Sequence, residues 1–258
     1  SVLFADMRNF TGISERLGAR ETVAMLNEFF GDMTEAIFNW QGVLDKFIGD
    51  SIMAVFGAPL EGERDADNAL ASAIEMMQIL RRLNDRRVQR GEMAIDVSIG
   101  IATGEVIAGT IGSAKRVDYT VVGDSVNLAA RLENVTRYYG AEIIVSEETI
   151  QQAKVSVRNR ELDLIRVKGR EQPSGIYEVL GHQTDETFPN MDDVLRHYSE
   201  GLSAYRQRNW DQAIRSFRSA LTANENDRPS NIYLERSVLF KENPPPGDWD
   251  GVWVMTSK

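Results

Sequence analysis

Asp45-Lys-Phe-Ile-Gly-Asp-Ser-Ile-Met-Ala-Val55 is the stretch of sequence that decides the fold. Its Gly-Asp pair separates two apolar runs, which predicts a tight β-hairpin with Asp50 in the turn. A second stretch, Leu3-Phe-Ala-Asp-Met-Arg-Asn-Phe-Thr11, predicts a strand that enters a turn at Asp6. If this strand and the hairpin pair in one sheet, the two carboxylates meet at one end. Paired carboxylates of this kind hold divalent cations for phosphoryl chemistry, with water and substrate phosphates as the other ligands.

Composition narrows the class of protein and the chemistry available to it. The 258 residues allow one large domain, or a domain of about 180 residues with a small annex. A net charge of −10 argues against a nucleic-acid partner, because nucleic-acid-binding surfaces are usually basic. The absence of cysteine excludes disulfides, thiol catalysis and thiolate metal sites. The two histidines, His182 and His197, lie far along the chain from both carboxylate motifs, which argues against a histidine-ligated metal or a Ser-His-Asp triad.

No stretch of the sequence predicts a signal peptide or a membrane span. The longest apolar stretch, Ile52 to Leu60, has nine residues and contains Gly57 and Pro59, so it is too short to cross a bilayer. The chain opens inside a strand without a lead-in, and we therefore expect it to be a fragment that lacks an upstream, regulatory part. We expect this fragment to be soluble and cytoplasmic, although the full-length protein could be tethered to a membrane.

Hydrophobic periodicity predicts the elements that surround the hairpin. Residues 20–39 form a helix, and a second helix follows over residues 65–90 after the breaks at Pro59 and Gly62. Alternation from Ile95 to Ile101 predicts a half-buried strand, and residues 103–112 are rich in turns. The inner face of the first helix is expected to hold Val23, Leu26, Phe30, Met33 and Ile37.

The second half of the region repeats the mixture of strands and helices. A strand over residues 119–122 leads through Gly123 into a helix that ends near Tyr139, with Asp124 and Ser125 as N-capping types. A strand at 143–145, a helix at 147–153 and a hairpin of residues 162–167 and 175–180 complete it. This order of elements predicts an α+β sandwich of the split βαβ kind, also described as ferredoxin-like or palm-like.

Residues 182–258 form a separate C-terminal extension in this interpretation, with 1–181 as the first domain. After a polar linker, apolar residues from Tyr198 to Leu221 trace two amphipathic helices, joined near Arg208-Asn209, that resemble one tetratricopeptide repeat. A single repeat cannot bury its own face, so we expect it to pack on the domain or on a partner. The tail carries two tryptophans, Trp249 and Trp253, which we expect to anchor it to a surface.

Four further residues have side chains suited to a nucleotide. Lys46 shares a strand face with residues 48 and 50 and could reach a ligand near Asp50. Asn127 and Arg131 are four residues apart on one helical face, where the arginine could clamp a phosphate and the asparagine hold a sugar oxygen. Lys168, at a predicted hairpin turn, is a flexible cation suited to a terminal phosphate.

Together these segments resemble the catalytic domain of the class III nucleotidyl cyclases, which make cyclic AMP or cyclic GMP. The matching stretches lie in order within residues 1–181: 3–11, 46–57, 100–105 and 118–133. The resemblance implies that Asp6 and Asp50 bind two Mg²⁺ or Mn²⁺ ions, with the Met7 carbonyl as a further ligand. It also implies that backbone amides of Asn9, Phe10 and Thr11 hold the triphosphate.

The resemblance further implies how the substrate is bound. Lys46 and Thr120 would contact the purine ring, and Val121 would contribute through its backbone. Asn127 would orient the ribose and Arg131 would stabilise charge at the α-phosphorus. Lys168 would hold the terminal phosphates. In this family the sites form across a head-to-tail homodimer, with the two aspartates from one subunit and the other side chains from its partner.

Two positions depart from the common pattern of the family. Asn9 stands where relatives commonly have glycine, and asparagine tolerates a positive φ better than most residues. Thr120 stands where many adenylyl cyclases have aspartate, which resembles a subgroup whose members often respond to bicarbonate. Bicarbonate is therefore a candidate effector.

The sequence leaves more than one function open. We expect an adenylyl cyclase acting on ATP, because the ammonium group of Lys46 can donate to adenine N1, where guanylyl cyclases typically have glutamate. A guanylyl cyclase is the first alternative. A catalytically silent, cyclase-like dimerisation module is the second, although such copies usually lose a metal aspartate or the Asn/Arg pair. An interaction protein built on the repeat-like extension is a third, and it is compatible with catalysis.

Overall fold

The computed structural model describes residues 1–113, 115–166 and 173–252. By their contacts the residues form two compact units. The first holds Ser1–Arg158 and Tyr177–His182, and the second holds Asn159–Ile176 and Gln183–Lys258. The boundary after residue 181 that the sequence suggests stays a prediction. Within the described residues, none of the helices combines the length and the hydropathy that crossing a bilayer requires.

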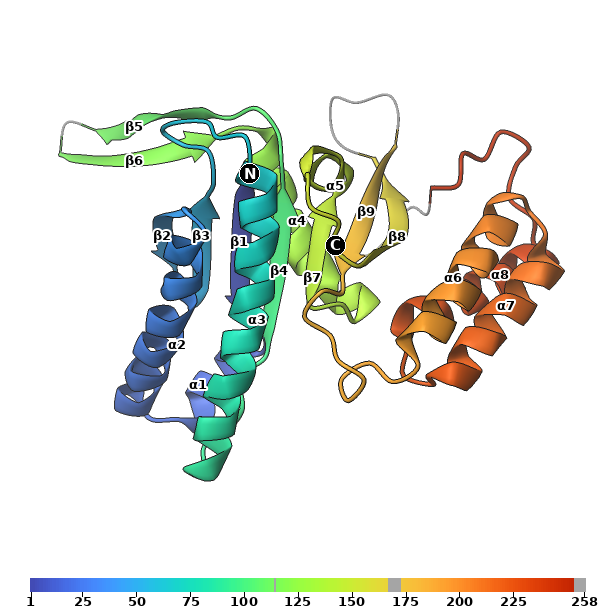
Figure 1. The fold of residues 1–258 in the computed structure, drawn as a ribbon, viewed down its shortest axis with the longest axis horizontal. Helices are drawn as coiled ribbons and strands as arrows, with labels where there is room; N and C mark the ends of the chain where they lie inside the picture. The colour runs from blue at the N-terminus through green and yellow to red at the C-terminus, as the bar shows by residue number, and fades with distance from the viewer. Residues whose placement is uncertain (114, 167–172, 253–258) are drawn as a thin grey trace. The chain divides into compact units, whose positions relative to one another are not determined.

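A central sheet with the strand order β2-β3-β1-β4-β7-β9 runs through the first unit (Figure 1). β1 pairs antiparallel with both β3 and β4, and β4 pairs parallel with β7. Because β1 lies between β3 and β4, the end of β1 is beside the turn of the β2–β3 hairpin. These strands are β1 (Val2–Met7), β2 (Val43–Ile48), β3 (Ser51–Val55), β4 (Val97–Ala102), β7 (Ile143–Ser146) and β9 (Ser174–Val179).

Helices cover both faces of this sheet. α2 (Ala19–Asn39) and α3 (Asp65–Gln89) lie on one face, and α4 (Asp124–Tyr139) lies on the other, over β1, β4 and β7 (Figure 1). The core between α2, α3 and the sheet contains Leu3, Ala5 and Met7 of β1, all of them essentially inaccessible to solvent. The α+β sandwich predicted from the sequence is therefore confirmed. Two shorter helices complete the unit, α1 (Phe10–Arg16) and α5 (Glu147–Gln152).

The buried face of α2 agrees in large part with the predicted one. Met33 and Ile37 are buried in the core, and Leu26 and Phe30 pack against it. Val23 is 56% exposed, however, and Met25 and Phe29 lie in the core in addition. Apolar residues occupy adjacent positions along this helix, so two overlapping stripes fit the sequence equally well. The contacts with α3 and the sheet select the stripe that contains Met25 and Phe29.

Strand β4 is buried on both faces, which corrects the expectation of a half-buried strand. α4 packs so closely on it that a Cβ at Gly100 would lie 2.2 Å from the backbone nitrogen of Glu133. The glycine therefore sets the position of α4, the helix that carries Asn127 and Arg131. Small or polar residues alternate with apolar ones in this strand because one side must accommodate a helix at short range.

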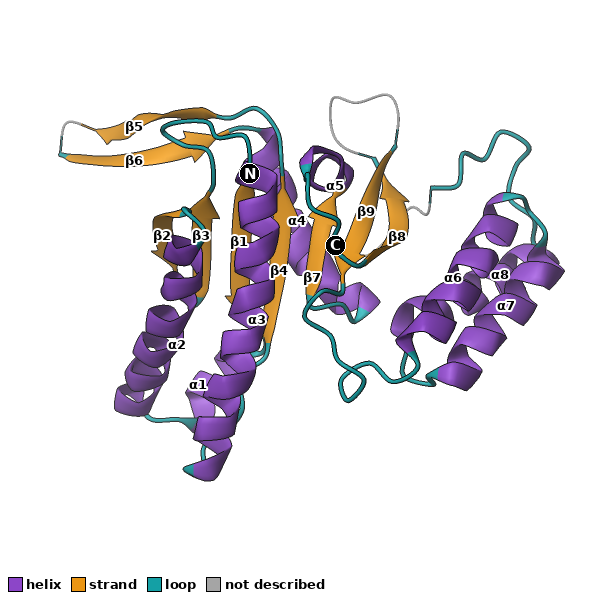
Figure 2. Ribbon diagram, viewed as in Figure 1, coloured by secondary structure: helices purple, strands orange, loops and turns teal. Residues whose placement is uncertain are grey.

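The passage predicted to be rich in turns contains a strand. β5 (Ile107–Ser113) pairs antiparallel with β6 (Arg116–Val122) in a two-stranded sheet separate from the central one. The hairpin projects beyond the central sheet (Figure 2). Gly109 and Gly112 concealed the strand because glycine usually marks a turn, whereas here both lie within the ladder. Ile107 is 76% exposed, so this hairpin presents apolar surface to its surroundings.

The helical part of the second unit contains the two predicted helices and a third one. α6 (Met191–Arg206) and α7 (Trp210–Ala223) are joined at Arg208-Asn209, as expected. α8 (Arg228–Glu242) packs against α7 (Figure 2) and contributes Tyr233 to the aromatic core. This third helix was not predicted, and it covers part of the face that a single repeat leaves open.

Trp249 packs against Tyr205, with ring centroids 5.4 Å apart, so the predicted anchoring is confirmed for this tryptophan. Trp253 lies outside the described residues.

Strand β8 (Asn159–Ile165) belongs to the second unit, where it is hydrogen-bonded to β9, the strand that the division crosses. Two deeply buried ion pairs hold it. Arg160 lies 2.7 Å from Asp227 at the start of α8, and Asp163 accepts a 2.6 Å hydrogen bond from Arg236 within α8. Burying an ion pair costs desolvation free energy, which is recovered only when the two charged groups have a well-defined geometry. The two pairs therefore fix the position of β8 relative to the helices of this unit.

Candidate active site

The turn of the β2–β3 hairpin places Asp50 beside the end of β1. Gly49 has φ 64° and precedes Asp50 in a two-residue turn, which suits a hairpin with glycine in the first turn position. The hydroxyl of Ser51 donates a hydrogen bond to Oδ1 of Asp6. Asp6 itself is on the face of β1 opposite to the core residues Ala5 and Met7, because successive side chains alternate along a strand.

The two aspartates interact electrostatically. Burial raises the pKa of Asp50, and the negative charge of Asp6 raises it further. A carboxylate whose proton affinity is raised by a neighbouring carboxylate is stabilised in its charged form by a bound cation. The expectation that Asp6 and Asp50 meet at one end of the sheet is therefore confirmed by the structure.

The donor set at this point fits a hard divalent cation. Two carboxylates and the backbone carbonyl of Met7 are oxygen ligands, and Mg²⁺ usually takes only one or two carboxylates from protein. The Met7 side chain is in the core, so only its backbone is available. No cluster of three or more His, Asp or Glu side chains suited to a metal occurs within residues 1–113, 115–166 and 173–252.

The turn after β1 adopts the conformation expected of its asparagine. Asn9 has φ 58° and ψ 30°, in the left-handed region, and α1 begins at Phe10. The amides of Phe10 and Thr11 are in the first turn of this helix, where backbone N–H groups have no partner within the helix. Asn9 therefore adopts the positive φ that asparagine tolerates better than most residues.

Lys46 and Thr120 are brought together by a residue that the sequence interpretation did not single out. The hydroxyl of Thr120 donates a 2.7 Å hydrogen bond to Oδ2 of Asp45, and Nζ of Lys46 lies 3.1 Å from Oδ1 of the same carboxylate. Lys46 pairs with Met53, which pairs with Phe4, so Lys46 lies on the same face of the sheet as Asp6. No local motif indicates Asp45, because its partner Thr120 lies on a distant strand.

The space next to these residues is small. Val121 is 5% exposed, so its side chain is buried and its backbone is the part that a ligand could reach. It lines, with Asp45, Tyr119 and Thr120, a cavity of about 40 Å³. Pockets for small molecules usually measure about 300–1,000 Å³. A nucleotide therefore needs more surface than this cavity offers.

Asn127 and Arg131 lie on one exposed face of α4, as predicted. Within the described part of the chain neither side chain makes a hydrogen bond or an ion pair. The N-cap of α4 is Gly123 and no side chain caps the helix, so the expected capping by Asp124 or Ser125 is wrong. The close approach of Gly123 to Val106 explains this start, since a Cβ at Gly123 would lie 3.2 Å from Val106.

Two residues of α4 lie near the aspartates and were not predicted. The guanidinium of Arg137 is 3.4 Å from Oδ2 of Asp6. Glu133 is 7% exposed, and burial raises its pKa to about 7, with a further contribution from Asp6. Spacing along α4 could have indicated that these two residues share a face, but not that the face meets Asp6.

The predicted site residues thus fall into separate groups. Asp6 and Asp50 meet at one edge, and Lys46 and Thr120 meet through Asp45. Asn127 lies ten residues before Arg137, which is about 15 Å along a helix axis, so it is remote from Asp6 in the same chain. Lys168 lies outside the described residues.

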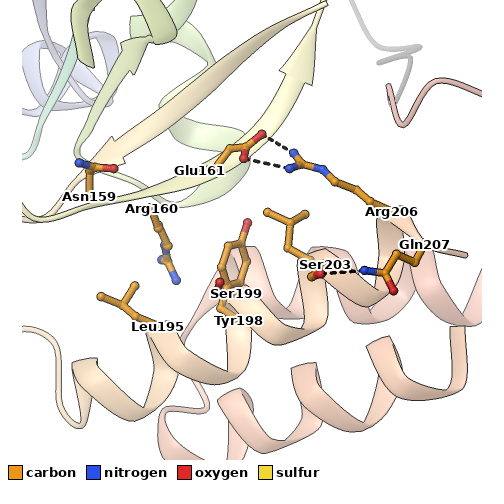
Figure 3. A pocket seen from close by; sticks show the side chains of 10 residues that line it. Asn159, Arg160, Glu161, Leu195, Tyr198, Ser199, Ser203, Arg206 and Gln207 are labelled. Carbon is orange, nitrogen blue, oxygen red and sulfur yellow. Dashed lines mark hydrogen bonds and ion pairs between the residues drawn. The ribbon is translucent and has the colours of Figure 1, made fainter. Parts of the chain in front are cut away.

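A larger cavity, of about 600 Å³, occurs in the second unit between β8 and α6 (Figure 3). Its charged side chains are engaged with one another. Arg206 donates two hydrogen bonds to Glu161, one of them 3.0 Å long, and Arg160 is paired with Asp227. None of the predicted site residues lines this cavity. We therefore do not assign the catalytic chemistry to it.

Comparison with known proteins places these features in a family. The family described as the adenylate and guanylate cyclase catalytic domain matches residues 1–181. An adenylate cyclase of Anabaena cylindrica is 39% identical over 186 residues, which are 69% of this chain and 36% of that protein. The terminal-differentiation-specific adenylate cyclase of Dictyostelium discoideum is 30% identical over 242 residues, 92% of this chain and 11% of that protein. The chain therefore spans little more than a third, or less, of these curated relatives.

A solved structure gives the same result for the fold. The crystal structure of the guanylyl cyclase Cya2 superimposes with a TM-score of 0.63 at 39% sequence identity. The match covers 70% of this chain and 90% of that chain. Proteins described as adenylate cyclases and as guanylyl cyclases thus reach equal sequence identity to this chain.

Proposed function

Because the chain belongs to the family of adenylate and guanylate cyclase catalytic domains, we propose that it converts ATP to 3′,5′-cyclic AMP and pyrophosphate. The observation that carries the proposal is the pair of carboxylates at one end of the sheet. Asp6 and Asp50 lie close enough for the charge of Asp6 to raise the pKa of Asp50. A cation bound to this pair would relieve the repulsion between its two carboxylates.

The residues of the chain have distinct roles in this reaction. Asp6, Asp50 and the Met7 carbonyl would hold two Mg²⁺ or Mn²⁺ ions. When bound there, these ions would activate the ribose 3′-hydroxyl and neutralise charge on the phosphates. The amides of residues 9–11 would hold the triphosphate, together with Lys168. These groups bring the 3′-oxygen into line with the α-phosphorus, and positioning and electrostatics then supply most of the acceleration.

The remaining roles belong to α4. Asn127 would orient the ribose, and Arg131 would stabilise the charge that develops at the α-phosphorus. Both side chains are exposed, and neither is engaged with another described residue, so they are available to a ligand. Arg131 lies about 9 Å along and about 120° around the helix from Arg137, the residue of α4 that contacts Asp6.

We therefore propose that the active enzyme is a homodimer with sites shared between subunits. Asp6 and Asp50 of one copy would face Lys46, Thr120, Asn127 and Arg131 of the other. Apolar side chains on the β5–β6 hairpin support such an association, because Ile107, Val117 and Tyr119 are each more than half exposed. The small cavity beside Thr120 also fits a site that is completed by a second copy.

ATP is the proposed substrate because of Lys46. Its ammonium group only donates hydrogen bonds, and adenine N1 accepts one, whereas guanine N1 carries a hydrogen. Conversion of GTP to cyclic GMP is the second candidate, because the structure described as a guanylyl cyclase is 39% identical to this chain. Activation by bicarbonate, suggested by Thr120, is proposed as a property of the same site.

The experiment that tests the proposal measures cyclic products directly. The full chain is incubated with ATP or GTP and with Mg²⁺ or Mn²⁺, and cyclic nucleotide and pyrophosphate are quantified by mass spectrometry. Cyclic AMP should form only with metal and should disappear in Asp6→Ala and Asp50→Ala. Asp211→Ala, which removes an exposed carboxylate from α7, is the matched control and should keep full activity. Retained activity in either aspartate variant, with the fold intact, would refute the metal assignment.

A further inference from the structure

Asp45 connects the two side chains that are proposed to contact the purine ring. Its side chain is only 4% exposed, although it belongs to a strand near the surface of the first unit. Oδ2 accepts the hydroxyl proton of Thr120 at 2.7 Å, and Oδ1 lies 3.1 Å from Nζ of Lys46. One carboxylate thus holds one group from β2 and one from β6.

The backbone of β2 explains how Asp45 reaches both partners. The pairing of β2 with β3 shifts its register between Leu44 and Lys46, so Asp45 is the additional residue of a β-bulge. In a regular strand, Asp45 and Lys46 would point to opposite faces of the sheet. A bulge redirects a side chain, and bulges commonly occur next to active sites for this reason.

The carboxylate determines the direction of the hydrogen bonds around it. A hydroxyl group can donate one hydrogen bond and accept two, and in isolation it can serve either kind of ligand atom. An ionised carboxylate only accepts, so Thr120 must use its single hydrogen on Asp45. The oxygen of Thr120 then remains solely as an acceptor for a ligand.

An acceptor at Thr120 and a donor at Lys46 together match one purine and not the other. Adenine presents a 6-amino donor next to the N1 acceptor, whereas guanine presents an O6 acceptor next to an N1–H donor. Guanine would therefore meet an acceptor opposite its own acceptor and a donor opposite its own donor. Such mismatches leave polar groups unpaired, which is how sites reject close analogues most strongly.

We propose that Asp45 is a specificity-determining positioning residue, which selects adenine over guanine by fixing Thr120 as a hydrogen-bond acceptor. It does not contact the purine; it acts through Thr120, whose single hydroxyl hydrogen it accepts. The inference rests on the proposed nucleotidyl cyclase function and deepens it, because it names the feature that distinguishes ATP from GTP in this chain.

The test compares ATP and GTP in the full chain with Asp45→Asn. The asparagine amide can donate to the Thr120 oxygen, which frees the hydroxyl hydrogen for guanine O6. The ratio of kcat/KM for ATP to that for GTP should fall by about tenfold, the effect of one hydrogen bond of reversed polarity. If Asp45→Asn folds poorly, Asp45→Ser takes its place in the measurement. The smaller serine side chain can also both donate and accept a hydrogen bond, so the ratio should shift in the same direction. Asp32→Asn on α2, where Asp32 is paired with Arg86, is the control and should leave the ratio unchanged.

A second background separates this role from a structural one. In Thr120→Val, which lacks the hydroxyl, Asp45→Asn should no longer change the ratio. An Asp45→Asn effect that reduces both substrates equally, or that persists unchanged in Thr120→Val, overturns the inference.

Failure of the proposed function gives a different result. If the wild-type chain forms no cyclic nucleotide from ATP or GTP with metal, the proposed function itself fails. Equilibrium binding of 3′-deoxy-ATP and 3′-deoxy-GTP, which lack the attacking hydroxyl, then measures the same ratio without turnover. A wild-type preference for the adenine compound that Asp45→Asn reduces supports the inference, and an unchanged ratio overturns it.

Discussion

Complementation between two inactive variants tests whether each active site is formed by residues from both subunits of a dimer. Within one chain, Asp6 contacts Arg137 in the last turn of α4, whereas Asn127 is in the first turn, about 15 Å away along the axis. Arg131 lies between them but on a different side of the helix. A nucleotide held at the α-phosphorus by Arg131 therefore meets the aspartates of a partner more readily than those of the same chain.

The expected magnitude follows from random pairing. Asp6→Ala and Arg131→Ala homodimers should each be inactive, because every site lacks one essential group. When equal amounts exchange subunits, half of the dimers are mixed, and each has one intact site and one doubly damaged site. About one quarter of the wild-type activity should therefore return in a symmetric dimer.

The assay is the rate of cyclic AMP formation at constant total protein, before and after exchange. Exchange is followed independently by mass spectrometry of the intact dimers, with one variant isotope-labelled. A mixture that contains the expected mixed dimers but stays as inactive as its components shows that each site is formed within one chain. Recovery of activity in a mixture of Asp6→Ala with Asp50→Ala would contradict the assignment of these two residues to the same subunit.

Three further outcomes are expected. Arg131→Ala should lower kcat by about 10²–10³ with little change in KM, because the guanidinium acts on charge that develops in the transition state; a raised KM at unchanged kcat would place it in substrate binding. Burial raises the pKa of Glu133 to about 7, above its ordinary value of 4.5. The contribution of protonated Glu133 to the free energy of unfolding is therefore fully present below pH 4.5 and is lost as the pH rises through 7. Glu133→Gln should therefore match wild type in metal-free thermal unfolding at pH 4.5 and be more stable at pH 8, and equal stability at pH 8 would contradict the assignment. Arg236→Ala leaves Asp163 buried without this ion-pair partner and should cost about 3–5 kcal/mol of unfolding free energy in urea denaturation. Lys241→Ala, which breaks the exposed pair with Asp211, should leave the urea midpoint nearly unchanged.

The parts of the fold that could be predicted are those determined by the pattern of apolar and polar residues among close neighbours in the sequence. The hairpin with Asp50 and the strand with Asp6 follow from alternation and from a glycine that must adopt a positive φ. The positions of α3 and α4 follow from long apolar repeats. In each case the information is contained within about 20 neighbouring residues, where periodicity is a direct consequence of geometry.

The parts that were missed depend on distant contacts. Asp45 is an ordinary strand residue until β6 places Thr120 within 2.7 Å of it. Arg137 resembles any exposed helical arginine until β1 brings Asp6 within 3.4 Å. The burial of β4 on both faces required knowledge of α4, and α8 was missed because its apolar stripe is weak. Tertiary neighbours, rather than local pattern, determined these features.

The two buried ion pairs of β8 limit where the chain can be truncated without loss of stability. The family match ends at residue 181, so a catalytic fragment cut there would keep Arg160 and Asp163 but lose Asp227 and Arg236. Both remaining charges would lose these ion-pair partners, and the last part of the fragment would be prone to misfolding or aggregation. A catalytic domain moved from this chain into another protein meets the same obstacle if the extension is left behind. In this chain, the part that must be kept together for stable folding is therefore longer than the part that matches the family.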